Sequence, residues 1–162
     1  MKTYGSDLML GNVIFGLVIP ILIGGWILRR NVNILLAYYP LGVATSSCLN
    51  GVGFNFFWNI LPNTHNQSYA GLPFDLGIYP IAGCLMIYVI LEKNTKSWLA
   101  ILITSFTLTL IEWLAKEMGR VIYFNGWNIY WTFFSYFLPL VVVYGYSKVF
   151  TMMYDVSKKK RT

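Results

Sequence analysis

The chain has 162 residues, of which 57% are hydrophobic and 11% are charged, whereas an ordinary soluble domain carries roughly 25% charged residues. This composition excludes an ordinary soluble domain and predicts an all-α integral membrane protein built from helices of about 20 residues. The net charge of +6 does not indicate nucleic-acid binding, since the basic residues lie at the ends of apolar runs and form no patch interleaved with aromatic residues.

The first two apolar runs each have the length of a membrane span. Residues 8–28 end at Arg29 and Arg30 and lack the cleavage site of a signal peptide, so we expect this run to remain as a helix. The second span is predicted over residues 34–58, with prolines and glycines of the kind that membrane helices tolerate.

A polar loop, NTHNQSYAG at residues 63–71, separates the second span from the third. The third span is predicted over residues 73–91. Pro73 suits the start of a helix, whereas Pro80 is expected to kink the interior.

Two more spans complete the chain, over residues 98–117 and 129–150. No repeat, linker or second domain is evident in the sequence. We therefore predict one domain over residues 1–162, a single bundle of five transmembrane helices.

The basic residues indicate which way the bundle faces. Five spans put the termini on opposite sides of the membrane, and cytoplasmic loops carry an excess of Lys and Arg. With the N-terminus outside, nine of the twelve basic residues are cytoplasmic: Arg29, Arg30, Lys93, Lys96, Lys148, Lys158, Lys159, Lys160 and Arg161. We therefore predict an outer N-terminus and a cytoplasmic C-terminus, whose basic tail lies near anionic membrane lipid.

The fourth span ends in a charged stretch, TLTLIEWLAKEMGR, that begins inside the membrane. At about 100° per residue, five polar residues project within about 80° of Glu112 and form one polar stripe with it. They are Ser105, Thr109, Lys116, Arg120 and Tyr123. Glu117 falls about 140° away and is expected to face headgroups or solvent. Because lipid cannot satisfy polar groups, the stripe is expected to face the bundle interior, as one wall of a polar cleft that opens outward.

Two interpretations of Glu112 stay open at this stage. The carboxylate can form a structural ion pair with Lys116, one helical turn away, or it can serve a ligand or a reaction. Asp75 has a similar pair of interpretations, because it also suits the first turn of its own helix as a cap. The remaining candidate ligand-binding residues near the same end are Tyr79, Asn55, Asn59 and Trp127.

Metal sites, cofactors and familiar catalytic motifs are not indicated. His65 lies in the polar loop without a second His or Cys nearby. Cys48 and Cys84 lie inside apolar runs, where a thiol usually behaves as a small buried hydrophobe. The sequence contains no P-loop, HExxH, GxSxG or paired CxxC pattern. We therefore predict neither a metal site nor a bound cofactor.

Three segments in order carry a resemblance to a known family. PFDLGIYP opens the third span, IEWLAKEMG ends the fourth and FNGWNIYWTFFSYFLPL opens the fifth. Over roughly residues 54–146 this pattern resembles a family of small, functionally uncharacterised multi-spanning membrane proteins of spore-forming Gram-positive bacteria. The matching residues are Asp75, Glu112 or Glu117, Trp127 and Trp131. The resemblance implies a multi-pass protein of the bacterial cytoplasmic membrane and brings no established activity with it.

Three functions are compatible with these features. The first is a module that binds a small polar or amphipathic, lipid-like ligand in the outward-facing cleft, in transport or sensing. The second is a regulatory or structural subunit that contacts another membrane protein or a second copy of the chain. The third is a membrane-embedded acid/base enzyme acting on an isoprenoid or lipid, and it requires the carboxyls of Asp75 and Glu112 to converge. We rank binding first and the enzyme last.

Overall fold

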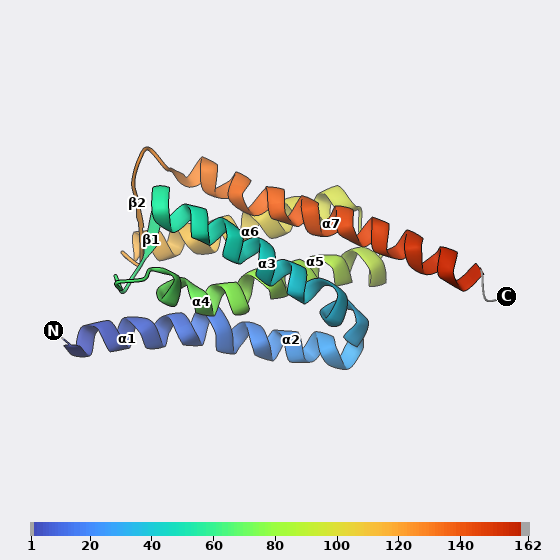
Figure 1. The fold of residues 1–162 in the computed structure, drawn as a ribbon, viewed down its shortest axis with the longest axis horizontal. Helices are drawn as coiled ribbons and strands as arrows, with labels where there is room; N and C mark the ends of the chain where they lie inside the picture. The colour runs from blue at the N-terminus through green and yellow to red at the C-terminus, as the bar shows by residue number, and fades with distance from the viewer. Residues whose placement is uncertain (1, 160–162) are drawn as a thin grey trace.

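The computed structural model describes residues 2–159 and shows a bundle of helices running along one long axis (Figure 1). Lys160 and Arg161 of the predicted basic tail lie outside the described residues. Within the described part of the chain, five helical rods are long and apolar enough to cross a membrane, which confirms the predicted fold class in that respect. These rods are Gly5–Arg30, Val32–Phe56, Ser68–Glu92, Ser97–Glu117 and Ile129–Met153.

Over residues 2–159, the fold consists of seven α-helices, one π-helical segment and two short strands. The first rod contains α1 (Lys2–Val13), the π-helical segment η1 (Ile14–Val18) and α2 (Ile19–Arg30). The others are α3 (Val32–Phe56), α4 (Ser68–Leu76) with α5 (Ile78–Glu92), α6 (Ser97–Glu117) and α7 (Ile129–Lys159). The strands are β1 (Trp58–Ile60) and β2 (Val121–Tyr123).

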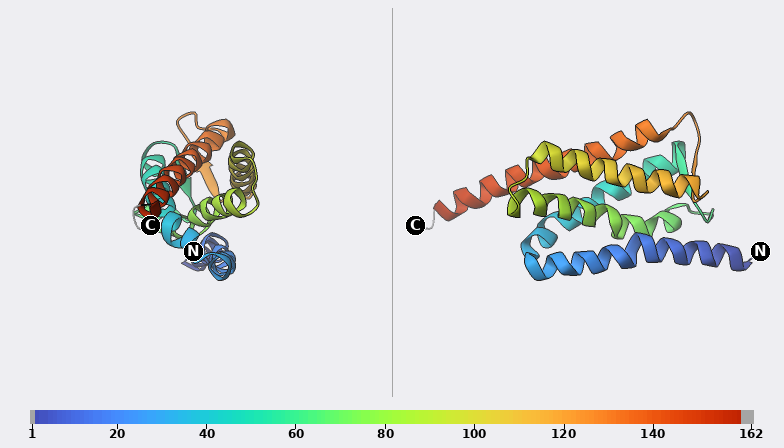
Figure 2. Two further views of the ribbon diagram at one scale, coloured as in Figure 1. Left: turned by 90° about the vertical axis from the view of Figure 1, so that its right-hand side faces the viewer. Right: turned by 180° about the vertical axis from the view of Figure 1, so that it is seen from behind.

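Helix α5 forms the centre of the bundle and packs against α2, α3, α6 and α7. Its sequence is apolar almost all round, which is the pattern of a helix that is buried on every side. Cys84 and Ile87 of α5 are fully buried, as predicted for the cysteine. The first rod lies at the edge of the bundle, where it packs against α3, α4 and α5 (Figure 2).

The third rod begins earlier than the sequence predicted. Helix α4 starts at Ser68, and Pro73 lies inside it rather than at its start. Asp75 therefore falls in the last turn of α4, not in the first turn of a helix. The interpretation of Asp75 as a helix cap was wrong. The free N–H groups that a cap accepts from lie in the first turn of a helix, and Asp75 lies at the other end of α4.

The third rod is interrupted at Gly77, between α4 and α5, three residues before Pro80. Pro80 has no N–H with which to bond the carbonyl of Leu76, four residues earlier. The hydroxyl of Tyr39 on α3 donates to that carbonyl instead, at 2.5 Å. At Gly77 itself, a Cβ atom would lie 1.9 Å from the carbonyl oxygen of Gly16 in η1. Only glycine therefore allows the first rod to approach the third this closely.

A two-stranded antiparallel ribbon, which the sequence did not predict, ties together the ends of α3 and α6. Helix α3 ends at Phe56, and Trp58, predicted as the end of the second span, lies in β1 opposite Tyr123. Helix α6 is closed by Gly119 at φ 69°, after which the N–H of Arg120 bonds the carbonyl of Ala115 at 2.8 Å. The chain then turns back toward α6. We refer to this end of the bundle as the strand end.

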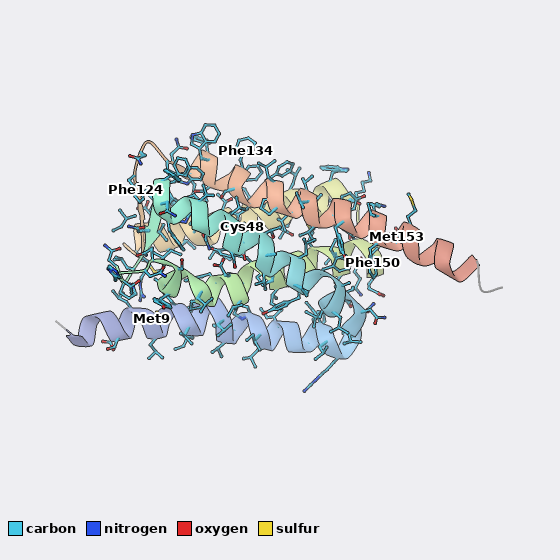
Figure 3. The ribbon with its side chains drawn as sticks, viewed as in Figure 1. Met9, Cys48, Phe124, Phe134, Phe150 and Met153 are labelled. Atoms are coloured by element: carbon cyan, nitrogen blue, oxygen red, sulfur yellow. The ribbon has the colours of Figure 1, made fainter. Side chains whose placement is uncertain are left out.

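Large apolar side chains cover the outward faces of the rods. Phe134, near the start of α7, projects away from the bundle (Figure 3). Cys48 is exposed on α3, so the expectation of a buried thiol fails at this position. Other exposed apolar residues include Phe15, Leu22, Leu36, Phe106 and Val142. This distribution is the one that a helical bundle presents to lipid, which solvates apolar side chains.

Candidate functional site

The carboxylate of Glu112 on α6 is enclosed by hydroxyl groups from two other segments. Tyr123 of β2 donates to its Oε1 at 2.5 Å, and Thr132 Oγ1 of α7 lies 3.1 Å from the same oxygen. Tyr136, one turn further along α7, donates to Oε2. We call Glu112, Tyr123, Thr132 and Tyr136 the Glu112 cluster. It joins α6, β2 and α7 near the strand end.

Two further side chains extend this cluster. Trp127 Nε1 donates to Thr132 Oγ1 at 3.0 Å, and the hydroxyls of Tyr79 and Tyr136 lie 3.4 Å apart. A phenol carries one proton, and that of Tyr136 is directed at Glu112. Tyr79 is therefore the donor to Tyr136, and the hydrogen-bond chain runs from α5 through α7 to the carboxylate.

The local sequence explains how the two α7 hydroxyls reach Glu112. Asn128 caps the helix, because its Oδ1 accepts from the backbone N–H of Tyr130 at 3.0 Å and of Trp131 at 3.4 Å. With the start of α7 fixed, Thr132 and Tyr136 follow four residues apart and lie on one face. That face is turned toward Glu112.

The charged residues of the predicted stripe separate in the structure. Lys116 pairs with Glu117 at 3.5 Å, and both side chains are exposed. Within residues 5–153, no Lys, Arg or His nitrogen lies within 4.0 Å of the Glu112 carboxylate. Arg120 Nη1 donates to the carbonyl of Leu8 at 3.3 Å. Glu112 is therefore held by neutral donors rather than by a cation.

Tyr123 remains a neutral donor in this setting. Burial raises the pKa of its phenol above the ordinary value, and the adjacent Glu112 carboxylate raises it further. Both causes disfavour the phenolate, because a second negative charge would sit in a poorly solvated site beside the first.

Two cavities meet at the Glu112 cluster. The first cavity, of about 50 Å³, lies among α3, α5, α6 and α7, and the second, of about 60 Å³, extends toward the strand end. Polar residues that line the first are Thr45, Ser46, Asn50, Tyr79, Glu112, Ser135 and Tyr136. Those that line the second are Asn12, Tyr79, Glu112, Arg120 and Tyr136. Since one water needs about 10–15 Å³ measured in this way, each cavity has room for a few waters.

Asp75 lies in a separate, tightly packed group. Its Oδ1 accepts from Asn50 Nδ2 at 2.7 Å, and Asn50 Oδ1 accepts from Trp58 Nε1 at 3.3 Å. Asp75 is 5% exposed and Asn50 is 6% exposed. We call Asp75, Asn50 and Trp58 the Asp75 cluster. Asp75 itself lines neither of the two cavities.

The enzyme hypothesis requires Asp75 and Glu112 to act on one substrate. The structure gives each carboxylate its own hydrogen-bond partners, and of the two only Glu112 lines the cavities. A shared acid/base site needs both groups within reach of one reacting atom, and the hydrogen bonds instead join the two carboxylates to different partners.

The other candidate residues divide between this site and the surface. Tyr79 and Trp127 belong to the Glu112 network. Asn55 is exposed and donates to the carbonyl of Gly51 in its own helix at 2.6 Å. Asn59 lies in β1 and lines an open polar groove together with His65 of the loop. No group of three potential metal-ligating His, Cys, Asp or Glu side chains occurs in the described part of the chain.

Sequence reasoning missed three residues of this region. Thr132 and Tyr136 were overlooked, although their spacing of four residues in an apolar span was a usable signal. Asn12 was also missed, and its Nδ2 donates to the carbonyls of Leu61 at 2.8 Å and Ala70 at 3.3 Å. A single amide in an otherwise apolar run marks the face that turns toward the protein interior.

Comparison of the chain with protein-family models, curated proteins and solved structures gives no match. The site is therefore interpreted from its own geometry.

Proposed function

We propose that the chain is a small integral protein of the bacterial cytoplasmic membrane that binds a small polar ligand beside Glu112. In this proposal the N-terminus and the strand end face outward, and the ligand enters the cavities from that side. The observation that carries the proposal is the Glu112 carboxylate, which is enclosed by neutral hydroxyls and borders both cavities.

The membrane assignment rests on three features. Apolar side chains cover the outward faces of five helices of spanning length. Within residues 2–159, seven of the basic residues fall on the side opposite the strand end, as the positive-inside rule requires of a cytoplasmic face: Arg29, Arg30, Lys93, Lys96, Lys148, Lys158 and Lys159. The resemblance to a family of small multi-spanning proteins of spore-forming bacteria supports the same location, and membership of that family is part of the proposal.

The cost of the Glu112 carboxylate supports a binding role. An ionisable group inside a membrane protein is expensive to maintain, and it normally serves a ligand, an ion or a proton. Here the expense is not offset by an ion pair within residues 5–153, since Lys116 pairs with Glu117. Ligand binding gives the group a reason to be present.

The volumes indicate which ligands fit. Cavities of about 50 and 60 Å³ are far smaller than the 300–1,000 Å³ pockets that hold drug-sized molecules. They suit a small polar ligand with water rather than an amphipathic, lipid-like one. Because Asp75 does not line these cavities, the geometry favours binding over acid/base catalysis.

Outward access can be tested by cysteine labelling in intact cells, in a Cys48→Ala background that removes the exposed native thiol. Ala115 lines the second cavity. We expect Ala115→Cys to react with a membrane-impermeant, charged thiosulfonate added from outside, because the cavity is reached from the strand end.

Two matched variants calibrate the labelling. Asn63→Cys, in the exposed loop at the strand end, should react fastest, whereas Lys96→Cys, at the opposite end, should react only after the membrane is permeabilised. Reaction of Lys96→Cys in intact cells would reverse the orientation. Protection of Ala115→Cys in intact cells, with Asn63→Cys labelled, would overturn outward access to the cavity.

A further inference from the structure

We infer that the ligand of the Glu112 site is a small monovalent cation, coordinated by the Glu112 carboxylate and by neutral oxygen atoms that line the first cavity. The inference rests on the proposed function and names its ligand. It departs from the expectation of no metal site, which considered His- and Cys-based ligand sets, whereas alkali cations bind through oxygen.

Charge is the first step: the first cavity carries one negative charge and no positive charge from its described lining residues. Among the described residues that line the first cavity, Glu112 is the single ionisable carboxylate and none is basic. A lone negative charge in a poorly solvated site is costly, and one positive charge placed beside it compensates that cost. An anionic ligand would add to the uncompensated charge, so a cation is the favoured class.

The second step is the supply of oxygen ligands. Tyr136 lines the first cavity, directs its proton at the carboxylate and accepts from Tyr79, which leaves one lone pair on its phenolic oxygen for another partner. Across the first cavity, the hydroxyls of Thr45 and Ser46 donate to backbone carbonyls and likewise keep lone pairs available. Ser135 completes the set from α7. The cavity therefore offers one carboxylate and several neutral oxygens.

The third step separates monovalent from divalent cations. Divalent sites usually gather several carboxylates, together with carbonyls and waters. In the described residues, no group of three His, Cys, Asp or Glu side chains is present, and Asp75 itself does not line the first cavity, since it lies behind Asn50. One carboxylate neutralises one monovalent charge, and the complex as a whole is then neutral.

The fourth step concerns Arg120, the basic residue that borders the neighbouring cavity. Arg120 lines the second cavity but not the first, and its guanidinium is anchored to the carbonyl of Leu8. The cation is therefore placed on the first-cavity side of Glu112, away from that charge. The pair of Tyr79 and Tyr136, whose ring centroids are 5.6 Å apart, adds aromatic faces beside this position.

The probe is thermal unfolding of the purified full-length protein in detergent or nanodiscs. LiCl, NaCl, KCl or NH4Cl replaces choline chloride at constant ionic strength, since choline is too large for a cavity of this size. We expect at least one of the four cations to raise the unfolding midpoint, and the midpoint to keep rising with its concentration, because a ligand that binds only the folded state stabilises it by mass action.

Variants locate the effect. Glu112→Gln should abolish the cation-dependent rise, while Glu117→Gln, which changes an exposed carboxylate five residues later, should leave it intact. Should Glu112→Gln fail to fold, Thr45→Val provides the second test. It removes one neutral oxygen from the first cavity and should raise the cation concentration at half-effect roughly tenfold, the equivalent of one lost hydrogen bond.

The pH supplies a further check, because a proton on Glu112 removes the charge that the cation needs. The titratable and charged groups facing Glu112 are Tyr79, Tyr123, Tyr136 and Arg120, and Asp75 lies behind the cavity-lining Asn50. Acidification should weaken the cation effect, and the same weakening in Asp75→Asn would assign it to Glu112 rather than to Asp75.

Several outcomes would overturn the inference. A midpoint that depends on pH but on none of the four cations would make the proton the ligand. Greater stabilisation by Mg²⁺ than by any monovalent cation would reject the charge argument, and a cation effect that survives in Glu112→Gln would place the site elsewhere. In each case, labelling of Ala115→Cys from outside would leave the accessible cavity standing, whereas its protection would remove the proposed function as well.

Discussion

The Asp75 cluster and the Glu112 cluster each hold one carboxylate inside the bundle, but they satisfy it differently. Asp75 receives a hydrogen bond from the amide of Asn50, whose own carbonyl oxygen is occupied by Trp58. Glu112 receives its hydrogen bonds from hydroxyl groups and lies beside two cavities. Asp75 is screened from the cavities by its partners Asn50 and Trp58, whereas Glu112 itself borders both cavities.

The proposed binding role of the Glu112 cluster rests on this difference. The Asp75 cluster joins α4 to α3 and to β1, so its hydrogen bonds hold elements together at the strand end. The Glu112 cluster joins α6, β2 and α7 while leaving room for a partner on one side. Both clusters hold a carboxylate inside the bundle, so burial does not set them apart. The cavity space beside Glu112 is what favours a ligand there.

The largest effect on stability is expected for Asn50→Leu, which removes the amide that donates to Asp75 and the carbonyl oxygen that accepts from Trp58. We expect a loss of about 2–3 kcal/mol in the free energy of unfolding, because an unsatisfied group in the interior loses its solvation without compensation. The measurement is unfolding of the purified protein in mixed detergent micelles.

A double-mutant cycle tests whether this loss belongs to the pair. Removing both partners, in Asn50→Leu with Asp75→Leu, should cost less than the sum of the two single changes. Asn55→Leu is the matched control, since Asn55 is exposed and bonds its own helix. Additive losses in the cycle would show that the Asp75 cluster is not a coupled unit, and the contrast between the clusters would weaken.

A smaller effect is expected for Thr132→Val in the Glu112 cluster. Valine keeps the shape of threonine but removes the oxygen that accepts from Trp127 and lies 3.1 Å from Glu112 Oε1. We expect a loss of about 1 kcal/mol in the free energy of unfolding, the worth of a typical hydrogen bond.

The matched control for this change is Thr107→Val. Thr107 is exposed on α6, and its hydroxyl donates only along its own helix, to Ile103 at 2.8 Å. It should leave stability nearly unchanged. Equal losses in the two variants would mean that the Thr132 hydroxyl contributes no more than a surface threonine.

The five rods could be predicted because each is a long apolar run bounded by polar or basic residues. The details that failed depend on contacts distant in sequence. Pro73 was predicted to start a helix, but residues 68–72, which were predicted to belong mainly to the loop, form the first part of α4. The ribbon pairs strands of three residues each, about 60 residues apart, and such short segments carry no recognisable alternation of their own.

The site was predicted in part, and in one instance for the wrong reason. Helical projection placed Tyr123 beside Glu112 by extending the fourth span through Gly119. The helix in fact ends at Glu117, and Tyr123 returns to Glu112 because the chain reverses at Gly119 and pairs with β1. The same projection placed Lys116 beside Glu112, whereas Lys116 pairs with Glu117. A helical wheel shows the direction of a residue but not which carboxylate its long side chain contacts.

Lys116→Ala is expected to have the smallest effect. It tests the interpretation that Glu112 forms a structural ion pair with Lys116. The pair of Lys116 with Glu117 is exposed, and ion pairs of this kind contribute about 0–1 kcal/mol. We expect the free energy of unfolding to fall by no more than about 0.5 kcal/mol, with the same small loss for Glu117→Ala and none for the double variant beyond either single change. A loss of about 2 kcal/mol or more for Lys116→Ala alone would mean that this lysine serves the enclosed Glu112 carboxylate instead. Glu112 would then already have its cation, and the first cavity would not bind a second one through this carboxylate.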